Sequence, residues 1–203
     1  MKSVFIALGI ILVTLISGCA TQNGNAIDLE DLLNKVNSLK ALQFDEVVTV
    51  VADGEIKSSY TRNFYVEGDK LRHEAESELG TFIIIINEDI PFEPGYYVAH
   101  KYDSEKDEWE LTDAKVYNMV FPDKFNDMVL GLEGEIFGNE IVDWKTTTAV
   151  SFTSPGQNDL KVWFWNENGL PIKKQDIYGN GMTITTEMKN IKIGDIDDSL
   201  FEK

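Results

Sequence analysis

Short segments of alternating apolar and polar residues, separated by Gly- and Asn-rich turns, occupy the last part of the chain. They predict three consecutive antiparallel strands, with Asn168-Gly169 as one of the tight turns between them. These strands are expected at residues 160–166, 170–178 and 182–193. In the last one, Met182, Ile184 and Met188 share one face, and mostly polar residues occupy the other. We therefore expect a sheet with one apolar and one solvated face, followed by a tail that closes the domain.

The same alternation runs through the earlier part of the chain and predicts further hairpins. The expected strands span residues 44–52, 55–67, 70–77, 81–87, 95–102, 108–112, 135–145 and 146–153. Four consecutive isoleucines, Ile83 to Ile86, are typical of a strand that is covered on both faces. Residues 88–95 hold two prolines and a glycine, so we expect a loop there. The chain has no regular alternation of strands and helices, which argues against a parallel sheet.

Two segments have the period of a helix rather than a strand. Residues 28–42 form the first, with Asn25 or Asp28 as the N-cap. Its apolar stripe consists of Leu29, Leu32, Leu33, Val36 and Leu39. Residues 122–132 form the second, which begins with a proline and ends at Gly134. Its apolar stripe consists of Phe125, Met128, Val129 and Leu132. Both helices are expected to pack on the sheet, where the second either fills the core or lines a cavity for an acyl chain.

The N-terminus has the pattern of an export signal. A positively charged start is followed by an apolar run over residues 4–16, which is shorter than the roughly 20 residues of a membrane span. Ile16-Ser17-Gly18-Cys19 then resembles a bacterial lipobox, in which cleavage before the cysteine exposes it for lipidation. This predicts a signal peptide at 1–18 and a lipidated Cys19 with a tether at 19–26. An ordinary signal with an unmodified thiol and an uncleaved anchor helix are the alternatives.

Charge narrows the range of partners. The formal net charge of −17 argues against nucleic acid, whose binding requires lysine and arginine contacts to phosphates. It also disfavours adsorption to anionic membranes, which attract basic segments. Membrane association is therefore expected through acyl chains on Cys19. Ala20 is compatible with an outer-membrane location if the host has one, and with the outer face of the cytoplasmic membrane otherwise. We expect a monomer.

No arrangement of residues predicts catalysis. His73 and His100 are the only histidines, and they form no metal-ligand spacing. The motifs of serine nucleophiles and of phosphate-binding loops do not occur. Residues 103–107 are acidic enough to suggest calcium, but they lack the glycine at position six and the glutamate at position twelve of an EF-hand loop. We therefore expect no enzyme activity, no cofactor and no metal site, and calcium at 103–107 remains an open alternative.

Two stretches resemble a known family. Residues 162–201 combine VWFW, an acidic-Asn-Gly-Leu-Pro turn, Lys-Lys, an alternating Thr/apolar strand, NIKI and DDSLF. Residues 65–74 read YVEGDKLRHE. Both are similar to segments of the LolA/LolB/LppX-like outer-membrane lipoprotein-sorting proteins. The resemblance implies a mainly β fold over residues 27–203. In it, a strongly curved antiparallel sheet forms an unclosed barrel, and the two helices cover its concave side over an apolar cavity.

Two functions are compatible with this resemblance. The first is an anchored protein that binds or carries a lipid, an acyl chain or a similar amphiphile. The residues proposed to line its cavity are Ile56, Tyr60, Phe64, Ile84, Phe125, Met128, Trp163, Trp165, Ile184 and Met188. The second is a tethered interaction or envelope-sensor domain with the same fold and a fully packed core. A filled core and a lined cavity use the same residue types, so the size of any cavity must separate the two.

Overall fold

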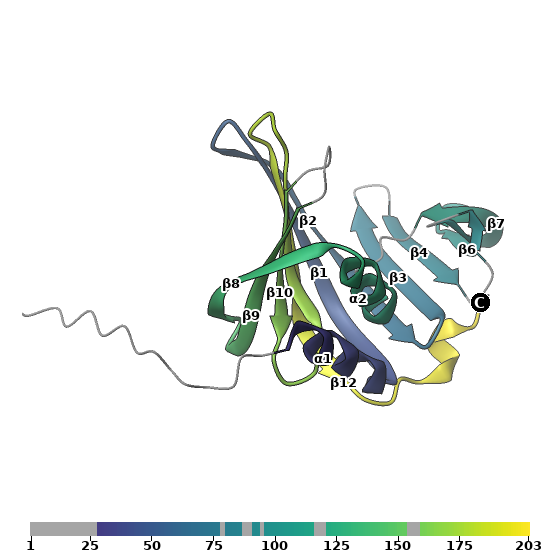
Figure 1. Ribbon diagram of the computed structural model, residues 1–203. Coiled ribbons are helices and arrows are strands. Elements are labelled where there is room, and N and C mark those ends of the chain that lie inside the picture. The colour runs from purple at the N-terminus through teal and green to yellow at the C-terminus, as the bar shows by residue number, and fades with distance from the viewer. Residues whose placement is uncertain (1–27, 78–79, 87–90, 94–95, 116–120, 154–158) are drawn as a thin grey trace, which may run out of the picture.

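The computed structural model describes residues 28–203, except 78–79, 87–90, 94–95, 116–120 and 154–158. Twelve strands in this part of the chain form one antiparallel sheet, and two α-helices lie against one of its faces (Figure 1). The strands are β1 (Ala41–Ala52), β2 (Glu55–Glu67), β3 (Lys70–Ser77), β4 (Gly80–Ile86), β5 (Pro91–Glu93), β6 (Tyr96–Asp103), β7 (Glu108–Lys115), β8 (Glu133–Val142), β9 (Lys145–Thr153), β10 (Asp159–Trp165), β11 (Pro171–Ile177) and β12 (Thr183–Ile193).

The first and last strands, β1 and β12, pair with each other at the middle of the sheet. The strand order runs β5-β6-β4-β3-β2-β1-β12-β11-β10-β9-β8, and β7 pairs with β6. β1 pairs with β2 on one side and with β12 on the other, where Val50 lies opposite Ile184. The sheet is strongly curved and is not closed into a barrel (Figure 1). The expected unclosed antiparallel half-barrel is therefore confirmed.

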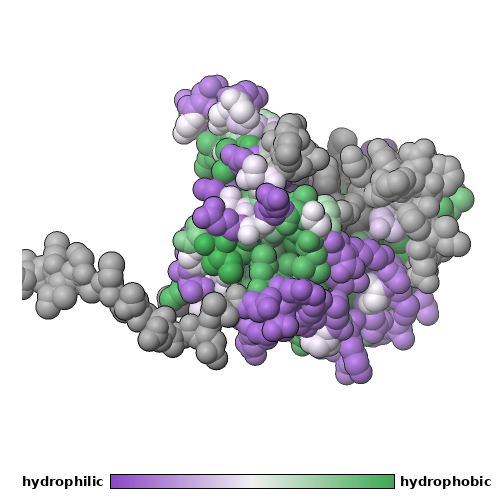
Figure 2. Space-filling model, viewed as in Figure 1, coloured by the Kyte–Doolittle hydropathy of each residue, from purple (hydrophilic) through white to green (hydrophobic). Residues whose placement is uncertain are grey.

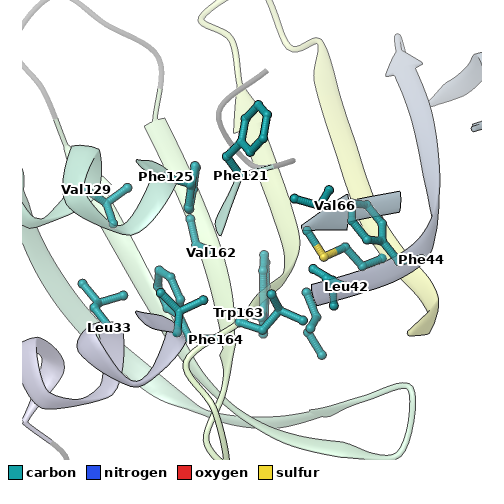
Figure 3. Packing of buried hydrophobic residues seen from close by; sticks show 14 of the residues in the cluster. Leu33, Leu42, Phe44, Val66, Phe121, Phe125, Val129, Val162, Trp163 and Phe164 are labelled. Atoms are coloured by element: carbon teal, nitrogen blue, oxygen red, sulfur yellow. The ribbon is translucent and has the colours of Figure 1, made fainter. Parts of the chain in front are cut away.

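We call the face that carries the helices the concave face and the other the outer face. Cross-strand pairs place Phe44 and Phe64 opposite each other on the concave face, and the two rings stack with centroids 5.4 Å apart. On the other half of the sheet, Val162 lies opposite Val150 on the same face. Figure 3 shows side chains of both helices directed at this surface. The buried cluster that results includes Leu33, Leu42, Phe44, Phe64, Phe121, Phe125, Val129, Val150, Phe152, Val162, Phe164 and Met188.

The first helix is shorter than the periodicity predicted. α1 covers Leu29–Asn34, and a 3₁₀ turn, η1 (Lys35–Ser38), follows it. The Asp28 carboxylate caps α1 by accepting from the backbone N–H of Glu30 at 2.9 Å. The expected extension to residue 42 is wrong because Ala41 and Leu42 pair with β2, and Leu42 also pairs with Ile193 of β12. The sheet bonds of this segment replace those of a longer helix.

The second helix, α2 (Pro122–Leu130), buries a stripe that differs from the expected one. Phe125 and Val129 face the core as expected, but Asn126 joins them and Met128 is exposed. The Asn126 side-chain amide donates to the backbone oxygens of Leu33 at 2.8 Å and Gly169 at 3.1 Å. This asparagine thus ties α2 to α1 and to the β10–β11 turn, which explains why a polar residue is buried there.

Other boundaries also shift. The expected loop at 88–95 contains β5, whose proline begins a short strand on β6, a position where the missing N–H costs little. The second helix ends at Leu130 instead of near Gly134, and β8 starts at Glu133. The β8–β9 turn lies at Asp143-Trp144, two residues before the expected position.

The isoleucine run of β4 is covered on both faces at Ile85 and Ile86, whereas Ile83 and Ile84 are half-buried. Ile86 faces the concave side opposite Leu71, and Ile85 faces the outer side opposite Arg72; both are fully buried. On the outer side, Arg72 donates to the backbone oxygen of Leu200 at 2.9 Å, which lies in the C-terminal 3₁₀ turn η3 (Asp198–Phe201). The tail therefore closes this end of the sheet.

Candidate functional site

A groove of about 340 Å³ lies in the concave face. It is formed by side chains of β1, β2, β11 and β12, and Tyr178 after β11. Its lining consists of Glu46, Val48, Tyr60, Arg62, Lys174, Asp176, Tyr178, Ile184 and Thr186. These residues are mostly polar, charged or aromatic, so the groove is amphipathic rather than apolar.

Strand register brings these side chains together. Val48 is paired with Tyr60 of β2 on one side and with Thr186 of β12 on the other. Thr186 is paired in turn with Lys174 of β11. Directly opposed residues of antiparallel strands share a face, so four strands contribute one row of side chains. The neighbouring row contains Ile184 and Asp176, which are also a register pair.

Two ion pairs form part of the groove wall. The Arg62 guanidinium Nε donates to a carboxylate oxygen of Glu46 at 2.8 Å, and Glu46 is only 2% exposed. Lys174 and Asp176 form the second pair, with an N–O distance of 3.1 Å. Arg62 also lies 5.4 Å from the ring centroids of both Tyr60 and Phe64. A buried carboxylate is stable only with such a partner, so Glu46 holds Arg62 against the aromatic rings.

His73 lies next to this charged pair on the concave face. Its ring stacks on Phe64, with the centroids 4.7 Å apart, and meets the edge of Phe82 at 5.9 Å. Its Nε2 atom is buried and has no hydrogen-bond partner among the described residues. Burial and, to a smaller degree, the positive charge of Arg62 lower the pKa of His73 to about 4. The imidazole is therefore neutral near pH 7.

Six of the ten residues predicted to line a cavity belong to the concave side, although only two line the groove. Tyr60 and Ile184 are lining residues. Phe64, Phe125 and Met188 are buried in the packed core. Ile84 is partly buried and packs against that core.

The other four predicted lining residues lie elsewhere. A bulge in the β1–β2 register displaces Ile56, which is 69% exposed near the hairpin turn. Met128 is on the exposed side of α2. Trp163 and Trp165 alternate with Phe164 along β10 and lie on the outer face, where Lys173 and Lys145 cover their rings at 4.7 and 5.3 Å. Cys19, the predicted lipidation site, lies outside the described residues.

Sequence reasoning missed the charged groove residues. Arg62 lies between Tyr60 and Phe64 on the apolar side of β2, and Glu46 occupies the equivalent row of β1. A charge at an apolar position of a strand was the available signal, because buried charges require a partner. Lys174 and Asp176 gave the same signal in β11.

The acidic turn at 103–107 uses its carboxylates internally. Asp103 accepts from the backbone N–H of Glu105 at 3.0 Å and binds the Lys106 ammonium at 3.0 Å. Asp107 accepts from the Tyr102 hydroxyl at 2.5 Å. Within the described ranges, no group of three or more His, Cys, Asp or Glu residues is arranged to hold a metal ion. None of the helices in the same part of the chain has the length and apolar character that crossing a bilayer requires.

Comparison with known proteins finds similarity in the fold and not in the sequence. No protein-family model matches the chain, and neither does any curated protein sequence. Solved structures do resemble it. An uncharacterised conserved protein from Thermus thermophilus superposes with a TM-score of 0.57 at 10% identity, over 86% of this chain and 92% of that one.

Two further solved structures of named proteins also resemble the fold. The lipoprotein LppX from Mycobacterium tuberculosis gives a TM-score of 0.50 at 11% identity, over 83% of this chain and 98% of that one. The MucA/MucB complex from Pseudomonas aeruginosa contains a chain that gives a TM-score of 0.53 at 18% identity, over 85% of this chain and 60% of that one. The LppX-like fold suggested by the sequence is thus confirmed.

Proposed function

We propose that this protein is a lipid-anchored extracytoplasmic binding protein whose concave groove holds one amphiphile, such as part of a lipid. The residue pattern supports a division into a signal peptide at 1–18, a lipidated Cys19 with its tether at 19–26, and a binding domain at 27–203. The anchor would hold the domain on the extracytoplasmic side of a membrane, which is the outer membrane where the host has one. We propose no catalytic role for the groove.

The observation that carries this proposal is the amphipathic lining of the groove. A volume of about 340 Å³ lies at the lower end of the roughly 300–1,000 Å³ typical of small-molecule sites. Val48 and Ile184 offer an apolar floor for a short hydrocarbon segment. Tyr60, Tyr178 and Lys174 offer hydroxyl and ammonium donors for an acidic or carbonyl-containing headgroup.

Lipid extraction tests the proposal. The chain beginning at Ala20 keeps every member of the buried cluster, because these residues all follow residue 28. It is purified from cells, extracted with organic solvent and analysed by mass spectrometry for bound acyl-containing species. We expect one such species in stoichiometric amount.

A matched pair of variants locates the binding site. Ile184→Trp fills the groove, whereas Thr185→Trp adds the same ring to the outer face of the same strand. We expect the first variant to lose the bound species and the second to keep it, with similar melting temperatures. A clean extract from the unaltered chain, with no thermal stabilisation when lipids are added back, would reject the amphiphile.

A tethered interaction domain is the second candidate, and the packing beneath the helices favours it. Phe125, Phe164 and Met188 fill that space, and all three are buried. One similar fold is found in a complex of two proteins, MucA and MucB. A lipid-free chain that binds a protein of the same envelope through its concave side would support this function over the first.

A further inference from the structure

The turn between β8 and β9 carries the most exposed large apolar side chain of the described residues. Trp144 is 96% exposed, and Ile141, three residues earlier near the end of β8, is 75% exposed. Figure 2 shows hydrophobic side chains gathered over the region of β8 to β10, while hydrophilic residues cover the outward surfaces of the two helices. Scattered single apolar residues are normal on protein surfaces, but a tryptophan held wholly in water at a hairpin tip is not.

The backbone of this turn makes Trp144 unfavourable for the fold itself. Asp143 has φ 47° and Trp144 has φ 63°. A two-residue hairpin turn with positive φ at both positions favours Asn-Gly, and a bulky side chain in the left-handed region is strained. Glycine at residue 144 would suit the turn better. The fold itself therefore gives no reason for a tryptophan at residue 144.

The tip is firmly connected to the rest of the domain. The backbone N–H of Asn166, in the β10–β11 turn, donates to the oxygen of Thr146 at 3.0 Å. The Lys35 ammonium donates to the oxygen of Asn166 at 2.8 Å, which connects η1 to the same end of the sheet. Trp144 and Trp165 are among the residues that line an open depression of about 460 Å³ between the two turns. An element that inserts into another phase needs a rigid base, and these contacts provide one.

We infer that the β8–β9 tip, formed by Ile141 and Trp144, docks into the interface of a zwitterionic membrane. Tryptophan rings favour the boundary between headgroups and acyl chains, because the ring is apolar and its N–H is a donor. The inference rests on the proposed anchor at Cys19. Eight residues lie between Cys19 and Asp28, and a segment of that length spans at most about 30 Å when extended. A tether of that length keeps the domain next to the membrane surface.

Charge argues against two other occupants of the tip. An antiparallel pairing of two copies centred on β8 places Glu135 opposite Glu140 twice, and like charges directly opposite each other are destabilising. The net charge of −17 on each copy adds repulsion. The same charge disfavours an anionic lipid surface. A neutral, zwitterionic surface matches an apolar tip on so acidic a protein.

The test uses the single cysteine of the chain. The chain beginning at Cys19 is coupled through its thiol to a maleimide lipid in phosphatidylcholine vesicles, so that tethering does not depend on lipidation in the cell. Fluorescence quenching by brominated phosphatidylcholine is measured for the unaltered chain and for Trp144→Phe, and their difference isolates Trp144. We expect this difference signal to be quenched by the brominated lipid and shielded from aqueous iodide at least about fivefold relative to untethered protein.

A second variant and a concentration series complete the test. Trp144→Gly should have an equal or higher melting temperature than the unaltered chain and show no lipid quenching above that of Trp144→Phe. Equal quenching of the unaltered chain and Trp144→Phe would overturn the inference, and so would shielding of Trp144 by rising protein concentration without vesicles, which would indicate a second copy. Failure of lipidation at Cys19 or of lipid extraction would instead count against the proposed function, since neither enters this measurement.

Discussion

The concave face has two halves that differ in how they use the same strands. In the helix-covered half, Phe44 of β1 and Met188 of β12 are buried beneath side chains of α1 and α2. A few residues further along the same strands, Val48 and Ile184 line a groove that also contains two ion pairs. The apolar alternation is common to both halves. What distinguishes them is the extent of the helices, which are too short to cover the whole face.

Removing a ring from the packed half should have the largest effect. Phe125→Ala leaves a cavity between α2 and the sheet, and we expect it to lower the free energy of unfolding by about 4 kcal/mol. Met128→Ala, on the exposed side of the same helix, should cost less than about 1 kcal/mol. Urea unfolding of both variants measures the contrast. Equal losses would mean that the two sides of α2 are not distinct.

Closing the space between α1 and the β10–β11 turn should be almost as costly. Gly169 has φ 71°, and a Cβ atom there would meet the backbone oxygen of Leu32 at 2.2 Å. Gly169→Ala combines left-handed strain with a backbone clash, for an expected loss of about 3 kcal/mol. Gly179→Ala, where a Cβ meets nothing within 4 Å, is the control. Unchanged stability in Gly169→Ala would show that α1 packs elsewhere.

His73, at the border between the two halves, should make the free energy of unfolding depend on pH. The pKa of His73 falls from its ordinary 6.5 to about 4 in the folded chain because its ring is buried. Between these values the unfolded chain binds a proton that the folded chain does not, so stability falls as the pH falls. The full contribution is about 3 kcal/mol. His73→Phe should remove this part of the pH dependence of unfolding, whereas parallel profiles for the two proteins would contradict it.

Removing a charge from the half of the concave face that contains the groove should have the smallest effect on stability. Glu46→Gln removes the Glu46 charge from its ion pair with Arg62, and the groove gives that guanidinium some access to water. We therefore expect a loss of about 2 kcal/mol, below the 3–5 kcal/mol typical of fully buried pairs. A second substitution, Arg62→Met, should recover most of it. If a double-mutant cycle found no coupling energy between the two positions, the Glu46–Arg62 ion pair would not contribute to the stability of this region.

The fold could be predicted from the sequence because most of its signals are local. The Asn168-Gly169 turn, the alternation in β12 and the apolar stripe of α1 all act within a few residues. The end of α1 was missed because Ala41 and Leu42 obtain partners in β2, and Leu42 a further one in β12, all more than 20 positions away in sequence. Tertiary pairing overrides helical periodicity at such a site.

The site was harder to predict than the fold. Tyr60 and Ile184 could be identified as inward-facing, but nothing local distinguishes them from Phe64 and Met188, which are packed. Trp163 and Trp165 were assigned to the wrong face, since aromatic rings mark burial without specifying the side. Here the outer face buries its own aromatic rings beneath lysine side chains, which a pattern of apolar residues does not reveal.

The pairing of β1 with β12 also sets the order in which the domain can form. The strands before α2 and those after it are built mainly from neighbouring hairpins, which close quickly. Among the described strands, the β1–β12 ladder alone joins the two groups within the sheet, and it brings together residues more than 100 positions apart, such as Val50 and Ile184. Contacts of such long sequence separation form late. β1 can therefore complete its pairing at the middle of the sheet only after β12, the last strand, is available. A polypeptide that is still being synthesised or exported lacks the ladder that connects the two halves of the sheet.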